Sequence, residues 1–201
     1  MVGKLDLSQF SWRNAPQKYA IEDGRLTIFT DPLTDFWQRT YYGFLHDNAH
    51  AFIFTAGEQD FTFSVKTVWQ PKNLFDQAGV VLYQDADNWM KASIEYDNPV
   101  FSRLGSVVTN LGYSDWSTTD IDSSLQSMFY RLSKREQDFL IENSEDGSLF
   151  RQMRVFHMHQ PIRSANIGVY ACSPLNSSMR VDFSDFMIGE CLWEAYQNPE
   201  D

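Results

Sequence analysis

Residues 89–97 read WMKASIEYD and alternate between apolar and mostly polar side chains. Successive side chains of a β-strand point to opposite faces, so this alternation predicts a half-buried strand. One face carries Met90, Ala92, Ile94 and Tyr96, and the other carries Trp89, Lys91, Ser93, Glu95 and Asp97. We expect the first face to pack in a core. The second face combines carboxylates, an amine and an indole, which suits a polyhydroxylated ligand.

Similar runs flank this strand and recur along the chain. Residues 77–84 and 101–110 adjoin it through short turns rich in Asp and Asn, which favour antiparallel hairpins. Further strands are expected at 25–30, 51–55, 60–69, 128–134, 137–143, 149–157, 166–172 and 179–188. Only residues 122–127 and 189–197 could form short helices.

This pattern predicts an all-β fold. Long helices do not alternate with strands, so a parallel sheet of βαβ units is disfavoured. We expect a two-sheet antiparallel sandwich of the jelly-roll type. No linker rich in Pro, Gly or Ser divides the 201 residues. The chain is therefore expected to form one domain over 1–201, with its core at about 10–190 and a short C-terminal tail.

Composition narrows the possible partners and compartment. The net charge of −11 disfavours nucleic acid as a partner. Residues 1–10 lack an apolar run and no stretch could span a bilayer, so we expect a cytoplasmic protein without a membrane partner. Cys172 and Cys191 are too few and too far apart to suggest a disulfide framework, so both are expected to be buried, reduced thiols.

Several blocks, in order along residues 10–190, resemble the domain-of-unknown-function family 1349. The blocks are residues 34–37, 42–44, 76–79, 88–91 with Glu95, 107–109, 114–117, 130–132, 144–147, 151–154 and 168–174. The resemblance implies a jelly roll of the concanavalin A-like lectin/glucanase type. It implies no particular activity, because that family has no general assigned reaction, and a fold alone does not fix a function.

Glycoside hydrolysis is one possibility to weigh. Related jelly-roll glucanases carry a Glu-x-Asp-x-x-Glu strand, and this chain has Glu95-Tyr96-Asp97 without the second glutamate. Glycoside cleavage needs two carboxyl groups, one of them held protonated. Lys91 is expected to lower the pKa of a nearby carboxylic acid rather than raise it. We therefore assign no catalytic residue.

Binding of a sugar needs fewer groups. An indole can stack on the C–H face of a sugar ring while polar neighbours fix the hydroxyls. The candidate ligand-binding residues are Asp35, Trp37, Arg39, Tyr42, Asp76, Gln77, Trp89, Lys91, Glu95, Trp116 and Arg131. Trp37 and Trp116 are the strongest aromatic candidates, since each lies beside an Asp in a segment that resembles a loop. The competing interpretations are core aromatics and a solvated sheet face with a Lys91–Glu95 ion pair.

Other chemistry has little support in the sequence. His157 and His159 could share a metal ion, but no third ligand is evident, and the acidic turns lack the pattern of a calcium loop. There is no nucleophile elbow, phosphate loop or dinucleotide motif. No metal or cofactor is expected.

Three hypotheses follow. The first is a non-catalytic domain that binds a carbohydrate, a sugar derivative or a small polyol on one sheet face. The second is a regulatory or scaffold protein that uses this face to bind an enzyme of sugar metabolism. The third is a glycoside hydrolase.

Overall fold

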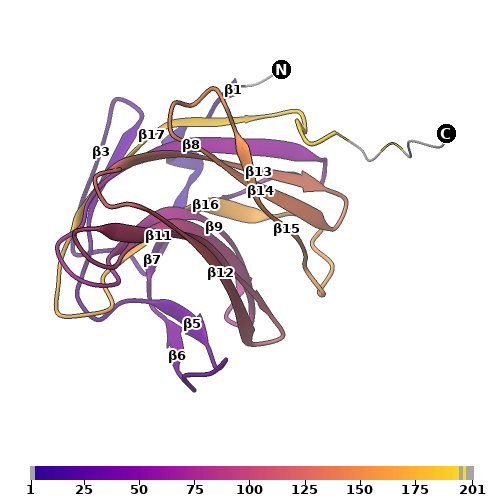
Figure 1. Ribbon diagram of the computed structural model, residues 1–201. Coiled ribbons are helices and arrows are strands. Elements are labelled where there is room, and N and C mark those ends of the chain that lie inside the picture. Colours follow the sequence, from indigo (N-terminus) through magenta and orange to yellow (C-terminus); the bar gives the residue numbers. More distant parts are fainter. Residues whose placement is uncertain (1–2, 195–196, 198–201) are drawn as a thin grey trace.

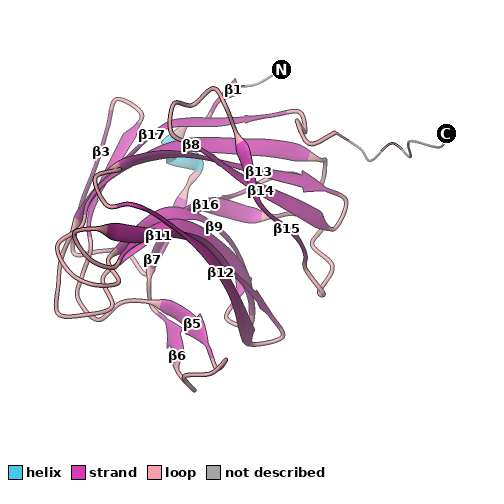
Figure 2. Cartoon of the chain, viewed as in Figure 1, coloured by secondary structure: helices cyan, strands magenta, loops and turns pink. Residues whose placement is uncertain are grey.

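Two antiparallel sheets face each other, and a small hairpin lies against the outer side of one of them (Figure 1). The computed structural model describes residues 3–194 and 197. Figure 2 shows that strands dominate residues 3–194, which also contain one short 3-10 helix at Leu7–Gln9. The expected all-β sandwich is confirmed.

The eight-stranded sheet has the order β15-β14-β13-β8-β17-β4-β3, with β1 also paired to β17. Its strands are β1 (Gly3–Lys4), β3 (Lys18–Glu22), β4 (Arg25–Phe29), β8 (Phe61–Gln70), β13 (Ser127–Arg135), β14 (Asp138–Ser144), β15 (Arg151–His157) and β17 (Arg180–Gly189).

The seven-stranded sheet has the order β12-β11-β10-β9-β16-β7-β2. Its strands are β2 (Ser11–Arg13), β7 (His50–Thr55), β9 (Gln77–Asp85), β10 (Asn88–Tyr96), β11 (Phe101–Asn110), β12 (Tyr113–Asp122) and β16 (Asn166–Cys172). The separate hairpin consists of β5 (Phe36–Gln38) and β6 (Leu45–Asp47).

The main core lies between the two large sheets and follows the alternation of β10. Met90, Ala92 and Ile94 are almost fully buried in it. They pack with large apolar side chains of the facing sheet, such as Phe63 and Leu132. Burying each such side chain stabilises the fold by roughly 1.5–3 kcal/mol, so the alternation fixes the register of β10.

A second apolar cluster fills the space between the seven-stranded sheet and the β5–β6 hairpin. Phe36 and Trp37 of the hairpin pack there with Tyr83, Trp89 and Tyr170 of the sheet. The ring centroids of Phe36 and Trp89 are 5.6 Å apart. The outer face of β10 is therefore covered at its Trp89 end and is not the uniformly exposed face that the alternation suggested.

Several elements differ from expectation. The short strands β1, β2, β3, β5 and β6 and the long strand β12 were not predicted. Residues 122–127 contain a turn between β12 and β13 rather than a helix, because backbone pairing continues to Asp122 and resumes at Ser127. Within 189–194 and at 197 there is no helix; residues 195–196 of that expected helix lie outside the described part.

Both described cysteines are free thiols, as expected. Cys172 is buried, but Cys191 is only partly buried, so the expectation of burial holds for Cys172 alone. No helix within residues 3–194 and 197 has the length and apolar character of a membrane span.

Candidate functional site

A pocket of about 470 Å³ opens on the outer face of the seven-stranded sheet, beside the β5–β6 hairpin. A volume of this size suits a small molecule. Its lining residues are Leu33, Asp35, Trp37, Tyr42, Phe44, His46, Phe75, Gln77, Lys91, Ser93, Glu95, Arg103, Gly105, Ser106, Val107, Trp116, Pro174 and Leu175. The pocket thus combines a group of polar residues from the sheet with aromatic residues from the hairpin and β12.

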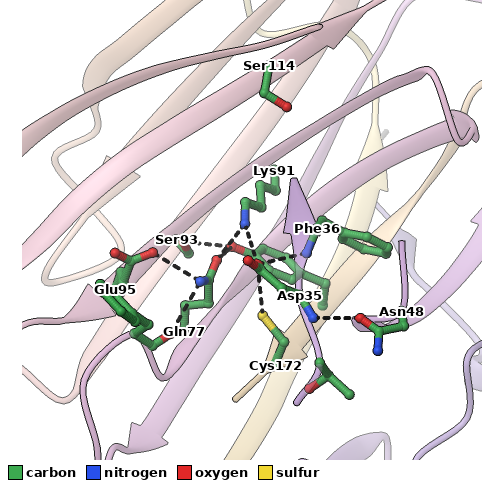
Figure 3. A network of polar contacts seen from close by, with 12 residues as sticks. Asp35, Phe36, Asn48, Gln77, Lys91, Ser93, Glu95, Ser114 and Cys172 are labelled. Carbon is green, nitrogen blue, oxygen red and sulfur yellow. Dashed lines mark hydrogen bonds and ion pairs between the residues drawn. The ribbon is translucent and has the colours of Figure 1, made fainter. Parts of the chain in front are cut away.

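The polar residues form a connected chain of contacts (Figure 3). Lys91 Nζ donates to Asp35 Oδ1 at 3.2 Å and to Gln77 Oε1 at 2.8 Å. The amide nitrogen of Gln77 donates in turn to Glu95 Oε2 at 3.0 Å. Gln77 therefore links the ammonium to the second carboxyl group. A Lys91–Asp35 pair is present in place of the direct Lys91–Glu95 pair of the competing interpretation.

Strand register explains how these side chains meet. Glu95 of β10 lies directly opposite Gln77 of β9 and Arg103 of β11. Residues directly opposite each other in a sheet share a face, with Cβ atoms about 5 Å apart. The sheet alone therefore brings Glu95, Gln77 and Arg103 together, and Lys91 follows on the same face of β10.

Asp35 reaches the sheet from the base of the hairpin. Its backbone N–H donates to Asn48 Oδ1 at 2.9 Å, and its own Oδ1 accepts the N–H of Phe36 at 2.7 Å. These contacts hold the carboxylate toward Lys91, as Figure 3 shows. The ion pair thereby connects the hairpin to the sheet beneath it.

Two further buried groups lie under the pocket floor. The hydroxyl of Tyr170 lies 2.7 Å from Ser93 Oγ and 3.0 Å from Gln77 Oε1, and Cys172 Sγ lies 3.9 Å from Asp35 Oδ1. Burial raises the pKa of both Tyr170 and Cys172 well above their ordinary values. Both groups stay neutral near pH 7, and the Cys172 thiol is unsuited to nucleophilic chemistry.

Lys91 is a nearly buried ammonium, with 5% of its surface exposed. Burial alone would lower its pKa, but the negative charges around it, Asp35 first, raise the pKa overall. Lys91 therefore stays charged, and the interpretation of a solvated face is wrong for this residue.

Burial and the charge of Lys91 act in opposite directions on the pKa of Glu95. Burial raises its pKa to about 7, and this effect outweighs the lowering by Lys91. Asp35 raises it further, while Arg103 lowers it. Lys91 lowers the pKa as expected, but the loss of hydration on burial has the larger effect, so the pKa of Glu95 is raised overall.

Aromatic rings form the walls of the pocket. Trp37 packs edge-on against Trp116, with ring centroids 6.4 Å apart, and against Tyr42 at 5.4 Å. Tyr42 stacks on Phe44 at 5.3 Å. The indole nitrogen of Trp37 donates to the carbonyl of Thr40 at 3.0 Å, which fixes the ring. The walls therefore offer apolar ring surfaces above a polar floor.

The structure brings together seven of the predicted binding residues as lining of this pocket. They are Asp35, Trp37, Tyr42, Gln77, Lys91, Glu95 and Trp116. Trp37 and Trp116 lie in strands β5 and β12 rather than in loops. That these residues bind a ligand stays a prediction.

Two of the predicted ligand-binding residues, one aromatic and one acidic, are buried instead. Trp89 is fully buried beneath Phe36 and donates its indole N–H to the carbonyl of Ala86 at 3.2 Å, so it cannot stack on a ligand. Asp76 is also fully buried, and its Oδ2 accepts the backbone N–H groups of Lys72 and Asn73. Asp76 therefore holds a turn together and does not line the pocket.

Two predicted arginines point elsewhere. Arg39 contacts Asp87 at 3.1 Å and the carbonyl of Gly112 at 2.7 Å, next to the turn between β11 and β12. Arg131 belongs to β13 of the other sheet, where it forms a double contact with Glu142 at 2.7 and 2.8 Å. Both arginines therefore lie outside the predicted cluster. Strand periodicity does not show which sheet, or which end of a sheet, a residue will occupy.

Several lining residues escaped the sequence analysis. Phe44 and His46 belong to the unpredicted hairpin, and Phe75 and Leu175 come from loops. Arg103 could have been found, since pairing of residues 88–97 with 101–110 places it opposite Glu95. The loop residues carried no such signal.

Comparison with known proteins places the chain in a family. The family model described as "Protein of unknown function (DUF1349)" matches residues 12–191. The chain belongs to this family. The resemblance found in the sequence is thereby confirmed. A Saccharomyces cerevisiae protein named "Regulation of enolase protein 1" is 32% identical over 193 residues, which cover 94% of each chain.

Solved structures agree with the fold. A functionally unknown protein from Saccharomyces cerevisiae superposes with a TM-score of 0.87 at 31% identity, covering 94% of this chain and all of that one. A GH43 protein from Bacillus licheniformis superposes with a TM-score of 0.68 at 16% identity, and the match covers 90% of this chain but 36% of that chain. The lumenal domain of VIP36, in a Ca²⁺/Man3GlcNAc-bound form, gives 0.56 at 10% identity over 97% of this chain and 88% of its own. The last two likenesses support the lectin/glucanase type of jelly roll and nothing about activity.

Proposed function

We propose that this protein is a non-catalytic, cytoplasmic binding domain for a carbohydrate or a sugar derivative, formed by residues 1–201 as one unit. The observation that carries the proposal is the pocket on the seven-stranded sheet, where aromatic walls stand over a floor of polar groups. A sugar has the matching two-sided character, with apolar C–H faces and a rim of hydroxyls. Trp37 and Trp116 would contact the ring faces, and Asp35, Lys91 and Glu95 would orient hydroxyls.

The floor is suited to hydroxyl groups because it offers donors and acceptors that are already held in place. Lys91 Nζ donates to Asp35 and Gln77, and an ammonium has a third N–H to offer a ligand. Glu95 accepts one contact from Gln77 and has a second oxygen. Groups that are fixed before binding lose little conformational entropy when the ligand arrives.

The binding test uses calorimetry with a panel of neutral monosaccharides and polyols. We expect binding to weaken about tenfold or more in Trp116→Ala, because a partly exposed ring proposed to contact the ligand is lost while the main core between the two large sheets is untouched. Tyr19→Ala is the matched control, since Tyr19 is a half-exposed aromatic residue on β3 of the other sheet. Binding that survives unchanged in Trp116→Ala and in a Lys91→Ala/Glu95→Ala double variant would remove the site.

A regulatory protein is the second candidate, and the name of the Saccharomyces cerevisiae relative favours it. Exposed apolar side chains adjoin the lining residues of the hairpin in sequence, including Tyr41 at 92% and Leu45 at 62% exposure. Exposed aromatic residues are enriched at protein interfaces. We would test binding to purified enolase, with Tyr41→Ala expected to weaken it and to leave sugar binding intact. Stoichiometric enolase binding without any sugar binding would favour this candidate over the first.

Hydrolysis stays the third candidate because the raised pKa of Glu95 suits an acid. Among the described residues that line the pocket, the other carboxyl group is Asp35, which is paired with Lys91. A panel of chromogenic glycosides tests this directly. We expect no turnover above that of Glu95→Gln.

A further inference from the structure

The Lys and Arg side chains among the described lining residues already have carboxylate partners. Lys91 pairs with Asp35 at 3.2 Å. Arg103 pairs with Asp97 through its Nε at 2.9 Å, and its Nη1 lies 3.8 Å from Asp120. Each Lys or Arg among the described lining residues is therefore neutralised from within the protein.

Glu95 adds a further carboxyl group to the same face. Its described hydrogen-bond partner is the neutral amide of Gln77, at 3.0 Å. An anionic ligand would therefore meet Asp35 and Glu95 together with cations that are already paired. Like charges brought together away from water repel strongly, and loss of hydration adds to the cost of binding an anion.

We infer that the pocket selects uncharged sugars or polyols and rejects their phosphorylated or carboxylated counterparts. This inference rests on the proposed function and narrows its ligand class. Rejection here comes from a built-in repulsive element as well as from missing attraction, which is a common basis of specificity. An uncharged hydroxyl loses nothing by this arrangement, because it can accept from Lys91 and donate to Asp35 or Glu95.

The Lys91–Asp35 pair is the element that a single substitution can change. Asp35→Asn keeps an Oδ1 atom that can accept the N–H of Phe36, but it removes the charge that neutralises Lys91. The freed ammonium would then be available to a phosphate group, for which lysine is a common ligand. The variant should therefore shift the preference toward anionic ligands.

Calorimetry with matched ligand pairs tests the inference on the full chain. The pairs are glucose with glucose 6-phosphate, mannose with mannose 6-phosphate, and sorbitol with sorbitol 6-phosphate, at about pH 8 and about 0.15 M NaCl. At that pH Glu95, with a pKa of about 7, is mostly ionised. We expect at least one neutral member to bind at least about tenfold more tightly than its phosphate, a difference of about 1.4 kcal/mol.

The ratio of the affinity for the neutral ligand to the affinity for its phosphate measures the preference. Asp35→Asn is expected to reduce this ratio by about tenfold. Glu95→Gln is expected to reduce it while leaving the Lys91–Asp35 pair in place. Asp138→Asn is the matched control, since it removes one charge from an exposed residue at β14 of the other sheet. It should leave the ratio unchanged. Thermal unfolding of each variant shows whether it is folded. If only one of the two pocket variants is folded, that variant alone is sufficient for the test.

The possible failures are distinct. If the phosphates bind as tightly as the neutral members or more tightly, the inference is wrong and the proposed sugar site still stands. An unchanged ratio in both folded pocket variants also overturns it, because the charges would then not set the preference. If neither member of any pair binds, the proposed function fails and the inference fails with it.

Discussion

Lys91 is a charged side chain held in a nearly buried position by a single carboxylate and an amide. Removing one partner of such a pair costs more than removing both, because the remaining charge is left without compensation. Lys91→Met should lower the free energy of unfolding by roughly 2–4 kcal/mol, somewhat below the cost of breaking a fully buried pair because Asp35 retains some contact with solvent. Urea denaturation measures this loss.

The double variant Asp35→Asn/Lys91→Met is the control for that prediction. The two groups are in direct contact, so their effects should not add. We expect the double variant to lose less stability than Lys91→Met and Asp35→Asn lose together. Strict additivity would mean that the contact contributes nothing to folding.

Glu95 should give the protein a measurable pH dependence. Its pKa is raised from 4.5 to about 7 in the folded state, so the folded protein holds a proton that the unfolded chain releases between these values. Ionisation of Glu95 therefore destabilises the fold progressively as the pH rises from about 4.5 to 7, and the loss is complete above 7. The charged residues that act on this carboxyl group are Lys91, Asp35, Arg103 and Asp97.

Glu95→Gln cannot ionise and should escape this loss. Relative to the natural chain, its free energy of unfolding should increase by roughly 2–3 kcal/mol between pH 5 and pH 8. Taking the difference between the two proteins at each pH cancels the titration of other groups. A difference that stays flat from pH 5 to 8 would show that the pKa of Glu95 is not raised.

At the scale of single residues, periodicity predicts which side chains share a face but not what covers that face. Lys91 and Glu95 were correctly placed on the side opposite Met90. Trp89 lies on their side of the strand, yet Phe36 buries it. That contact joins segments far apart in sequence, and a period of two carries no information about it.

At the scale of elements, the β5–β6 hairpin decides whether the pocket exists. Residues 39–44 connect its strands with Gly43 at a φ of +73°, a conformation that favours glycine. A Cβ at Gly43 would meet no atom within 4 Å, so a substitution there acts on the backbone alone. Tyr42 and Phe44, on either side of it, line the pocket.

Gly43→Ala should therefore destabilise the hairpin by about 1 kcal/mol and weaken sugar binding severalfold. Gly57→Ala is a close control, because its Cβ would also meet no atom within 4 Å and its φ is not in the left-handed region. Thermal unfolding and calorimetry of the two variants make the comparison. Equal sugar affinity in both variants would contradict a role of the hairpin conformation in binding.

The strands that the sequence did not predict are either exposed strands at a sheet edge or strands too short to show a pattern. β3 is exposed along its whole length, and β12 is exposed at most positions. Both lie at a sheet edge, where backbone pairing to one neighbour holds a strand without burying an apolar face. β5 and β6 each span three residues and pair only with each other, which is too short for alternation to show.

At the scale of the whole molecule, the net charge of −11 should affect stability. An excess of one sign destabilises the compact state through self-repulsion, and salt screens charges at the surface. Raising NaCl from about 10 mM to about 150 mM shortens the screening length from about 30 Å to about 8 Å. We expect Tm at pH 7 to rise by a few degrees. A fall in Tm would mean that favourable surface pairs outweigh the repulsion.

The overall architecture could be predicted because it repeats one local rule. Alternating or mostly apolar runs recur in the long central strands β8, β9, β10, β11 and β13, and each of these was expected. The pocket depends instead on a contact between segments far apart in sequence, since Asp35 and Lys91 are separated by 56 positions. Their polar types could be read from the sequence, but their pairing depends on how the hairpin docks.

The central claim is that a neutral sugar binds in the pocket lined by Trp37 and Trp116. The most direct measurement is a two-dimensional ¹H–¹⁵N spectrum of the tryptophan indole groups during titration with the tightest-binding neutral sugar. We predict that the Trp37 and Trp116 signals shift with one common saturation curve, while those of the buried Trp69 and Trp89 stay in place. Signals of Trp37 and Trp116 that remain fixed while the sugar binds would contradict the account.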